Sequence, residues 1–265
     1  MLRFLSLMAH NDGGVSFFND SANGIAPRKT RIEAYAAKLG FDVCQFDPIK
    51  FQAVDSDASG YMIASASGAK LIFDAANIGP DYIPGHAHAD SLSFELSIGD
   101  ERVFVNTGTS QYGLGDQRLR ERGTAAHNTV EVEGKDSSQV WSGFRVAKRA
   151  RVIERTAESD EGRVTLSASH NGYEAIYGGP IHTRSLSLTG DSLCVVDKLS
   201  GNFDTALARF YFHPSLTVGL EHNVLSVSGV GFDMTADLTA LSASLLPSTW
   251  HPEFGLSQPN ICLVC

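Results

Sequence analysis

The sequence has few cysteines, no long apolar run and no excess of positive charge, and each absence excludes a class of protein. Its four cysteines show no disulfide framework, and the pair Cys262 and Cys265 stands alone at the chain end, so neither a zinc ribbon nor a thioredoxin motif is indicated. We expect all four thiols, including Cys44 and Cys194, to be free. No segment approaches the roughly 20 consecutive apolar residues of a membrane helix. The net charge of −9 argues against a nucleic-acid partner.

Two further signals are missing. No glycine-rich phosphate loop leads from a strand into a helix, and the opening run MLRFLSLMAH is too short and broken for a signal peptide. We expect this run to be the last helical turns of a region that began earlier. The charge is also uneven, because residues 102–151 carry a net charge of +4 and the rest of the chain carries −13. This basic island predicts either a site for an anionic ligand or a set of solvated strand faces.

Residue periodicity predicts a short helical start followed by many strands. Residues 2–9 and 26–40 have helical patterning, and in the second segment Pro27 suits a first turn and Gly40 a helix end. From about residue 51 the chain consists of strand-like segments, which Gly-Asp, Glu-Gly and Gly-Asn pairs separate at hairpin-like intervals. The expected fold is mainly β, a large antiparallel β-sandwich with a short N-terminal helical segment.

The segment PGHAHADSLSFELSIGD, residues 84–100, places two histidines and an aspartate within five positions. In an extended chain His86, His88 and Asp90 would project from one face, because residues two apart share a face. We therefore expect a polar row at the mouth of a strand that continues into the core. Asp90 is expected to fix a histidine tautomer or a turn rather than to react.

Other candidate groups follow in the motifs VFVNTGTSQYGLGDQRLRERGTAAHNTV and SHNGYEAIYGGPIHTR. Each residue alone has an ordinary explanation as a hydrogen-bonded or solvated side chain, but imidazole, phenol, amide and guanidinium groups are crowded here. Glycoside hydrolysis usually needs two carboxylates, and Asp90 and Glu95 fall on opposite faces of the expected strand. β-Elimination of a uronic acid instead needs donors that neutralise the sugar carboxylate, a base and a proton donor. The groups present favour β-elimination.

A zinc site is the second chemical option that the residues allow. His88, His127 and a residue near position 106 are candidate ligands, although their wide separation in the sequence gives no spacing signature. Position 106 is Asn106, whose neutral amide is a poorer ligand than a carboxylate.

A resemblance to the heparinase II/III-like family of polysaccharide lyases rests on an ordered set of motifs: GPDYIPGHAHADSLSFEL, RVFVNTGTSQY, RLRERGTAAHNTVEVEGKDSSQVWSGFRVAKRA, HNGY and PEFG. In that family an (α/α) toroid packs against a C-terminal antiparallel β-sandwich, with the active site in the cleft between them. The resemblance implies that residues 1–42 are a helical remnant of the toroid and residues 43–265 the sandwich domain. It also implies that the family's tyrosine base and carboxylate-neutralising Asn or His lie on a toroid upstream, so this chain holds half of an active site.

Carried over residue by residue, the resemblance implies catalysis by His86 and Tyr112, substrate binding by Arg118, Arg122 and Tyr173, and a structural metal site at His88, Asn106 and His127. For the two arginines it leaves two roles open, facing the substrate or fixing a loop. The family's middle metal ligand is an aspartate, so Asn106 departs from the pattern, and a metal-free hydrogen-bond cluster is the alternative. The expected chemistry requires no cofactor, and a structural zinc is the one metal that the resemblance suggests.

The expected function is therefore the sandwich part of a polysaccharide lyase that cleaves a uronic-acid-containing acidic polysaccharide by β-elimination. Its expected partners are that polysaccharide and an upstream toroid, with no nucleic acid and no membrane span. The alternatives are a non-catalytic module that binds an anionic glycan through the basic island, and a purely structural sandwich. The resemblance places the protein in the periplasm or cell envelope. Heparan-type, alginate-type and bacterial exopolysaccharides all fit the sequence.

Overall fold

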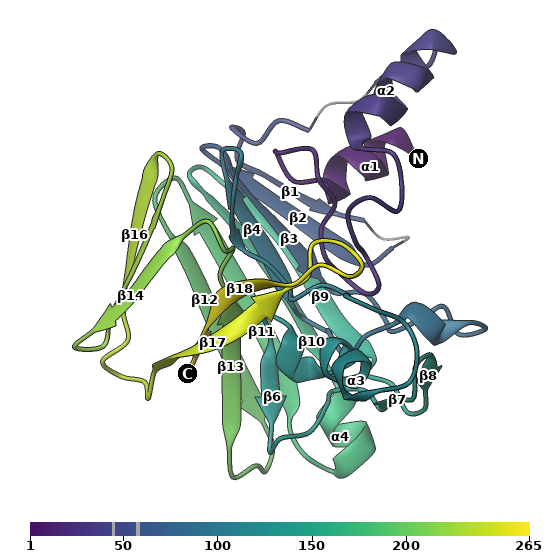
Figure 1. The fold of residues 1–265 in the computed structure, drawn as a ribbon. Helices are drawn as coiled ribbons and strands as arrows, with labels where there is room; N and C mark the ends of the chain where they lie inside the picture. The colour runs from purple at the N-terminus through teal and green to yellow at the C-terminus, as the bar shows by residue number, and fades with distance from the viewer. Residues whose placement is uncertain (44–45, 57–58) are drawn as a thin grey trace.

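The computed structural model describes residues 1–43, 46–56 and 59–265, so the thiol of Cys44 lies outside the described residues. Within them Cys194, Cys262 and Cys265 are free, as expected. Antiparallel sheets stack into a sandwich, with a few short helices at its edges (Figure 1). This arrangement confirms the mainly β fold that the sequence predicts.

The first layer of the sandwich is a five-stranded sheet in the order β1-β2-β3-β4-β5. Its strands are β1 (Gln52–Asp55), β2 (Tyr61–Ala66), β3 (Ala69–Asp74), β4 (Phe94–Ile98) and β5 (Glu101–Phe104). Gly68 links β2 to β3 and Gly99 links β4 to β5, both with positive φ, which is the conformation that tight hairpin turns require.

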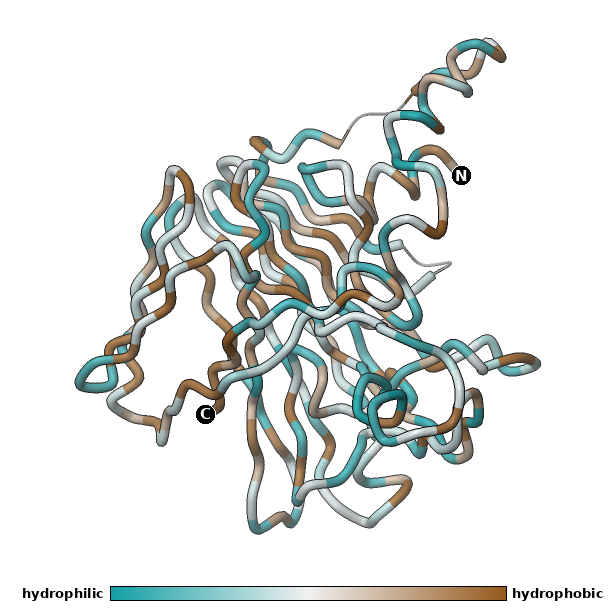
Figure 2. The backbone as a smooth tube through the Cα atoms, in the orientation of Figure 1, coloured by the Kyte–Doolittle hydropathy of each residue, from teal (hydrophilic) through white to brown (hydrophobic). Residues whose placement is uncertain are grey.

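The second layer is a four-stranded sheet in the order β12-β11-β10-β9. Its strands are β9 (Val152–Asp160), β10 (Arg163–His170), β11 (Ile181–Thr189) and β12 (Leu193–Ser200). The main core lies between the two layers, where Phe73 and Phe94 of the first sheet meet Leu166 and Leu186 of the second. Figure 2 shows apolar and polar residues alternating along the strands, and in β10 and β11 of the second layer burial alternates with them, as a sheet with one buried face requires.

Further strands extend the molecule beyond the two layers. A sheet in the order β17-β18-β13-β6 joins the first layer through a bridge between Phe104 and Phe212. The remaining strands are β6 (Val130–Val132), β7 (Val140–Trp141), β8 (Arg145–Val146), β13 (Ala206–Tyr211), β14 (Thr217–Glu221), β15 (Val224–Gly229), β16 (Phe232–Asp237), β17 (Ser244–Trp250) and β18 (Gln258–Val264). The sequence pattern did not indicate β17 or β18, because Pro247 and Pro259 interrupt their runs.

The helices are short and lie at the periphery. They are α1 (Leu2–Met8), α2 (Lys29–Lys38), α3 (Asp116–Arg122) and α4 (Gly172–Tyr177), with 3-10 turns η1 (Pro84–His86) and η2 (Thr124–Ala126). The first two fall inside the expected helical segments, and α2 projects away from the sandwich (Figure 1). Among the described residues, none of the helices has the length and apolar character that a membrane crossing requires.

The segment between α1 and α2 packs on the outer face of the first sheet through buried polar groups. His10 Nε2 lies 2.8 Å from Glu95 Oε2, and His10 Nδ1 lies 3.1 Å from Ser97 Oγ. The Lys70 ammonium donates to two backbone carbonyls at the end of α1. The polar row of β4 therefore faces protein rather than solvent, which explains why both faces of this strand are buried. The boundary between residues 42 and 43 stays a prediction.

Candidate functional site

The histidines at 86 and 88 do not lie on an extended strand. Pro84–His86 form the 3-10 turn η1, Leu92 has a positive φ of 62°, and β4 begins only at Phe94. The expected strand geometry is wrong here because Pro84 starts a helical turn, and a second turn, closed by the Ser93 N–H and the Asp90 carbonyl, follows it. The two imidazoles still converge, but on a carboxylate from another part of the chain.

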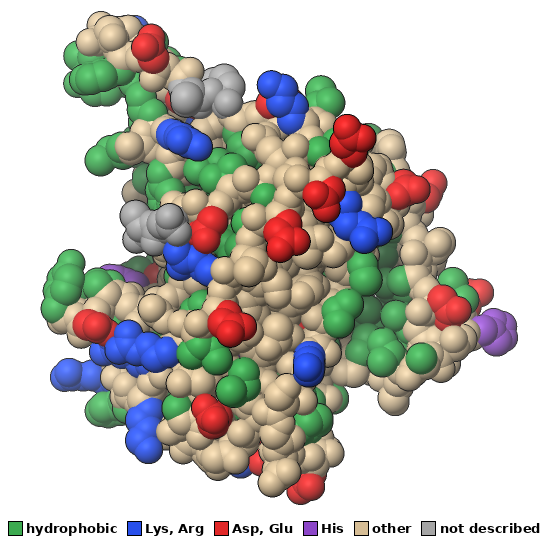
Figure 3. Space-filling view, turned by 180° about the vertical axis from the view of Figure 1, so that it is seen from behind, with side chains coloured by type: hydrophobic (Ala, Val, Ile, Leu, Met, Phe, Trp, Pro, Cys, Tyr) green, Lys and Arg blue, Asp and Glu red, His purple; other side chains and the backbone are tan. Residues whose placement is uncertain are grey.

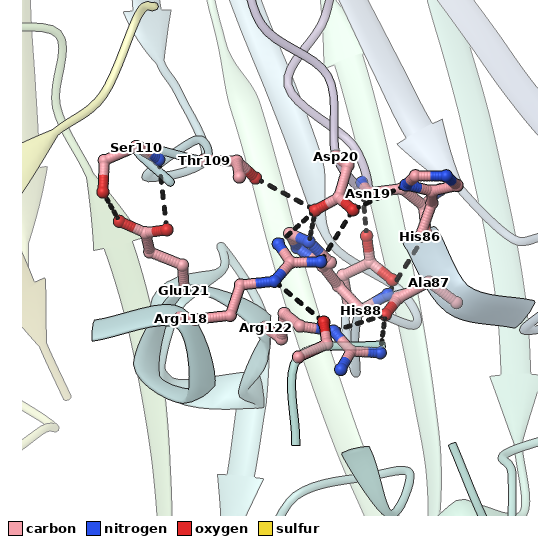
Figure 4. Close-up of polar contacts among 12 residues, drawn as sticks. Asn19, Asp20, His86, Ala87, His88, Thr109, Ser110, Arg118, Glu121 and Arg122 are labelled. Atoms are coloured by element: carbon pink, nitrogen blue, oxygen red, sulfur yellow. Dashed lines mark hydrogen bonds and ion pairs between the residues drawn. The ribbon is translucent and has the colours of Figure 1, made fainter. Parts of the chain in front are cut away.

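Asp20, in the loop between α1 and α2, is the centre of the site. His86 Nδ1 lies 2.9 Å from its Oδ2, and His88 Nε2 lies 2.9 Å from its Oδ1. The Arg118 guanidinium binds both carboxylate oxygens, with Nη2 2.7 Å from Oδ2 (Figure 4). A carboxylate can only accept, so it fixes the proton of each imidazole on the nitrogen that faces it. The Nε2 atom of His86 is thereby directed away from Asp20.

The charge of Asp20 is held in place by its neighbours. Burial opposes ionisation, but the hydrogen bonds from His88 and Arg118, together with their charges, outweigh it and hold the pKa of Asp20 well below its usual range. Asp20 is 8% exposed. Near neutral pH Asp20 is therefore ionised, and its buried carboxylate lies next to the imidazole of His86.

Arg118 and Arg122 are both fully buried, and their contacts are with loops. Arg118 Nε donates to the carbonyl of Gly143 at 3.0 Å, while Arg122 donates to the carbonyls of Ala87 and of the β7–β8 hairpin. Burial, followed by the charge of Arg118, lowers the pKa of Arg122 to about 10. The sequence left two roles open for these arginines, facing the substrate or fixing a loop, and these contacts support the second. They tie α3 to η1 and to the hairpin.

Aromatic rings surround the exposed side of His86. The ring centroids of Tyr112 and Phe144 each lie 5.9 Å from that of His86, and Tyr112 also packs on Phe144 at 5.1 Å and on Phe254 at 4.8 Å. The Arg118 guanidinium lies 5.1 Å from the Tyr112 ring centroid and supports it from beneath the surface. The His86 side chain remains 66% exposed. The exposed imidazole of His86 thus packs against the rings of Tyr112 and Phe144.

The Tyr112 hydroxyl is suited to give a proton rather than to take one. Burial and the charge of Asp20 raise the pKa of Tyr112 above its usual value, although Arg118 opposes the shift. The phenol is 44% exposed and stays protonated near neutral pH. His86 and Tyr112 therefore offer a proton acceptor and a proton donor side by side.

A buried group beneath His86 has the composition of a metal site. The ligand atoms of His88, Asp90 and His127 all lie within 4.8 Å of one another. His88 Nδ1 and His127 Nε2 are 3.3 Å apart, close to the spacing of two nitrogens on a tetrahedral zinc with Zn–N of about 2.0–2.1 Å. Among the described residues, Asp90 Oδ1 and His127 Nδ1 have no hydrogen-bond partner. The other nitrogen of His88 donates to Asp20, as metal-bound histidines usually do to a carboxylate. These residues fit zinc.

Asn106, the third metal ligand implied by the resemblance, is fully buried but engaged elsewhere. Its Oδ1 accepts the N–H of Asn128 at 3.0 Å, and its own N–H donates to Glu95 at 2.8 Å. The amide oxygen is the atom that would bind a metal, but it accepts a backbone hydrogen bond instead. Asp90 supplies a carboxylate to the histidine pair. Its Oδ2 also accepts the N–H of Asn19 and holds the Asp20 loop, in keeping with the turn-fixing role expected for it.

Tyr173 lies in a different part of the molecule. It is 1% exposed, packs with Val130 and Val132, and donates its hydroxyl proton to the Val130 carbonyl at 2.6 Å. These are the contacts of a core residue, and they leave no surface for the substrate contact that the resemblance implies.

Sequence reasoning missed Asp20, Phe144 and Phe254. The loop HNDGGVSFFNDSANG signals only a turn-rich segment, and the partner that makes Asp20 important, Arg118, is 98 positions away. Phe144 and Phe254 fall inside the motifs WSGFRVAKRA and PEFG, so a signal was present, but no chemistry marked these rings as neighbours of His86.

Comparison with known proteins identifies relatives of the chain. The sequence profile of the family described as Heparinase II/III-like, C-terminal, matches residues 49–262, most of the chain. No curated protein matches the sequence.

Several solved structures share the fold. A heparan sulfate lyase HepC mutant from Pedobacter heparinus superposes with a TM-score of 0.74 at 17% identity over 100% of this chain and 43% of its own. A heparinase III gene product gives 0.74 at 16% identity, over 100% of this chain and 42% of its own, and a further heparinase III gives 0.73 at 14%, over 99% and 44%. This chain thus spans less than half the length of these enzymes. At such identities the likeness concerns the fold.

Proposed function

Because this chain belongs to the Heparinase II/III-like, C-terminal family, we propose that it is the sandwich part of a polysaccharide lyase and forms one side of its active-site cleft. The substrate we infer is a polysaccharide that contains uronic acid. Heparan sulfate is the first candidate, because the similar structures include a heparan sulfate lyase and heparinases III. An upstream toroid is the inferred other side of the cleft.

The observation that carries this proposal is the imidazole of His86. It is open to solvent, oriented by a buried anion and set against a phenol that stays protonated. A histidine that supported the fold from within the core would instead be enclosed and hydrogen-bonded at both ring nitrogens. The arrangement of carboxylate, imidazole and outward lone pair is the one that general bases use.

The two proton transfers of β-elimination can be divided between His86 and Tyr112. We assign the base to His86 rather than to the toroid tyrosine that the resemblance implies: its Nε2 atom accepts the proton from the carbon next to the uronate carboxylate, and Asp20 stabilises the imidazolium that forms. The electron pair of the broken C–H bond becomes the new C=C bond as the glycosidic C–O bond breaks. Tyr112 then gives its proton to the leaving oxygen. The donor that neutralises the uronate carboxylate is assigned to the toroid, because the buried arginines of this chain are engaged by loops.

A zinc ion at His88, Asp90 and His127 is a structural part of this proposal. When bound, it would link the η1 segment to the segment after α3 and so hold Asp20 and Tyr112 in register. No step of the elimination uses it, since the three residues are buried beneath His86.

The direct test is the ultraviolet absorbance of the unsaturated uronate product. It is measured with a panel of acidic polysaccharides on this chain alone and on the chain extended upstream to include any toroid. Product from the extended protein alone would support a lyase of which this chain is one half. The absence of product from both, for every polysaccharide, would overturn the proposal. Cell fractionation would test its remaining part, a location in the periplasm or cell envelope.

A non-catalytic glycan-binding module is the second candidate. The exposed cations Arg145, which follows Phe144 in the chain, and Lys148 favour it, because they suit an anionic chain without any need for catalysis. Retention of acidic glycans by a protein that yields no product in either form would select this function over the first.

A further inference from the structure

The β7–β8 hairpin carries an exposed tryptophan and an exposed arginine side by side. Trp141 and Arg145 are directly opposite each other in its register, so their side chains share one face. Trp141 is 54% exposed, and Arg145 is also exposed. Within the described part of the chain, the guanidinium of Arg145 has no ion pair or hydrogen bond, in contrast to Arg149 and Arg151, which both bind Asp81.

This hairpin is held rigidly beside the cleft. The buried arginines of α3 bind the carbonyls of Gly143, Ser142 and Arg145 in its tip and second strand. Phe144, between those carbonyls, packs 5.1 Å from Tyr112 and 5.9 Å from His86. The hairpin that carries Trp141 and Arg145 is therefore fixed in place, with its turn residue Phe144 next to the imidazole, so little ordering would accompany ligand binding.

The surroundings of the hairpin are apolar and basic together. Tyr82, Ile83 and Leu114, on the neighbouring loops, are 88%, 61% and 83% exposed. Figure 3 shows Lys and Arg side chains gathered next to apolar ones on the side of the molecule that carries the hairpin. A pyranose ring offers an apolar C–H face to an aromatic ring, and its carboxylate or sulfate groups pair with a guanidinium fork. One acidic sugar would satisfy both residues.

We propose that Trp141 and Arg145 form a subsite for an acidic sugar ring of the glycan chain, outside the bond that His86 acts on. The inference rests on the proposed function for the identity of the glycan, but binding at this subsite needs no catalysis. A protein surface is the less favoured occupant, because covering the hairpin would desolvate the unpaired charge of Arg145. A sulfated or carboxylated sugar brings the counter-charge with it.

The test is calorimetric titration of this chain with a heparan sulfate octasaccharide. Trp141→Ala and Arg145→Gln should each weaken binding roughly tenfold, the loss expected for one charged hydrogen bond or one stacked ring. The matched controls are Arg163→Gln and Phe203→Ala, which remove an exposed arginine from β10 and an exposed aromatic ring from the β12–β13 turn. With unsulfated heparosan the effect of Arg145→Gln should shrink while that of Trp141→Ala persists.

Equal affinity of the two variants, the controls and the wild type would overturn the subsite, as would an absence of binding by the wild type. A loss of thermal stability in the upstream-extended chain, with glycan affinity unchanged, would also overturn it and assign the hairpin to a protein interface. These results are separable from the proposed function, which fails only if no polysaccharide yields unsaturated product. A lyase whose hairpin variants bind normally would lack the subsite alone.

Discussion

Two regions of the molecule contain nearly the same side chains but differ in what those side chains can do. The Asp20 group joins an aspartate to an arginine and three histidines: Asp20, Arg118, His86, His88 and His127. The sheet group, on β10–β12, joins an aspartate to an arginine and two histidines: Asp197, Arg184, His170 and His182. Each group has an aspartate bound by its arginine through two hydrogen bonds and a pair of imidazoles 3.3 Å apart.

The difference lies in exposure and in unused hydrogen-bonding capacity. In the sheet group both imidazoles are fully buried, and His170 Nδ1 accepts the N–H of Gly172 at 3.0 Å, so both ring nitrogens of each histidine have partners. In the Asp20 group His86 is exposed to solvent, and among the described residues His127 Nδ1 is a buried atom without a partner. The same residue types thus build a closed structural network in one place and, in the other, an open group with unused hydrogen-bonding capacity.

The largest expected contrast comes from removing one histidine of each group. In the chain extended upstream, His86→Ala should lower kcat for β-elimination by roughly 10²–10⁴-fold, the usual loss of a general base, with the Tm unchanged. His182→Ala should instead lower the Tm, because it removes a buried hydrogen bond to Asp197 and leaves His170 Nε2 without its partner, and should spare kcat of the folded protein. Product absorbance and thermal unfolding measure both. Unchanged turnover in His86→Ala would remove this residue from the mechanism.

Neutralising the two aspartates should show that both groups support the fold. Asp20→Asn and Asp197→Asn each leave a buried arginine without its anion, so urea unfolding should report a loss of about 3–5 kcal/mol in either variant. Only Asp20→Asn should also reduce turnover in the fraction that remains folded. A loss under about 1 kcal/mol, as for an exposed pair, would contradict the burial of the corresponding arginine.

The sheet group should also give the protein a pH dependence. Burial lowers the pKa of His170 well below the ordinary 6.5, and it lowers the pKa of His182 although Asp197 opposes it. Below pH 6.5 the unfolded chain binds protons that the folded histidines exclude, so stability falls as pH falls towards their folded pKa values. His170→Gln should flatten this slope by up to about 1.4 kcal/mol per pH unit between pH 6.5 and 5. Urea unfolding measures it, with the exposed His222→Gln as control; identical slopes would refute the assignment.

Zinc binding should have the smallest effect on stability. It should also distinguish the two groups, because only the Asp20 group has a buried ligand atom without a hydrogen-bond partner among the described residues. Added Zn²⁺ should raise the Tm by a few degrees through binding to the folded state alone. Asp90→Asn should abolish this rise, whereas His170→Gln should retain it, because the sheet group has no free ligand atom. Retention of the rise in Asp90→Asn together with its loss in Asn106→Ala would show that the amide, rather than Asp90, is the third ligand.

Local signals explain which parts of the fold the sequence predicts. Gly68 and Gly99 mark hairpin turns, and alternating apolar residues mark β10, β11 and β15, so the antiparallel sandwich follows from short-range patterns. Pro247 and Pro259 hide β17 and β18, since proline lacks the N–H that a strand ladder uses and therefore argues against a strand in the sequence pattern, although the two strands pair with each other. The family motifs bring His86, Tyr112 and the arginines to one region, as expected.

The candidate site is less predictable because its decisive contacts are long-range. Asp20 sits in an ordinary turn-rich loop, and only the fold places it against Arg118 and His88. Burial likewise decides the role of Tyr173, which the motif HNGY presents as a polar candidate and the core encloses. The bend at η1 overrides the period-two pattern of 86, 88 and 90, since turn geometry outweighs alternation once a proline starts the segment.

The position of Asp20 has a consequence for the order in which the protein matures. Its partners lie 66 to 98 residues later in the chain, so the ribosome must release most of the first sheet and α3 before the carboxylate meets a cation. Contacts between such distant positions close late in folding. In a nascent chain Asp20 therefore emerges long before its cationic partners, and the hydrogen bond that orients His86 depends on completed folding of these segments.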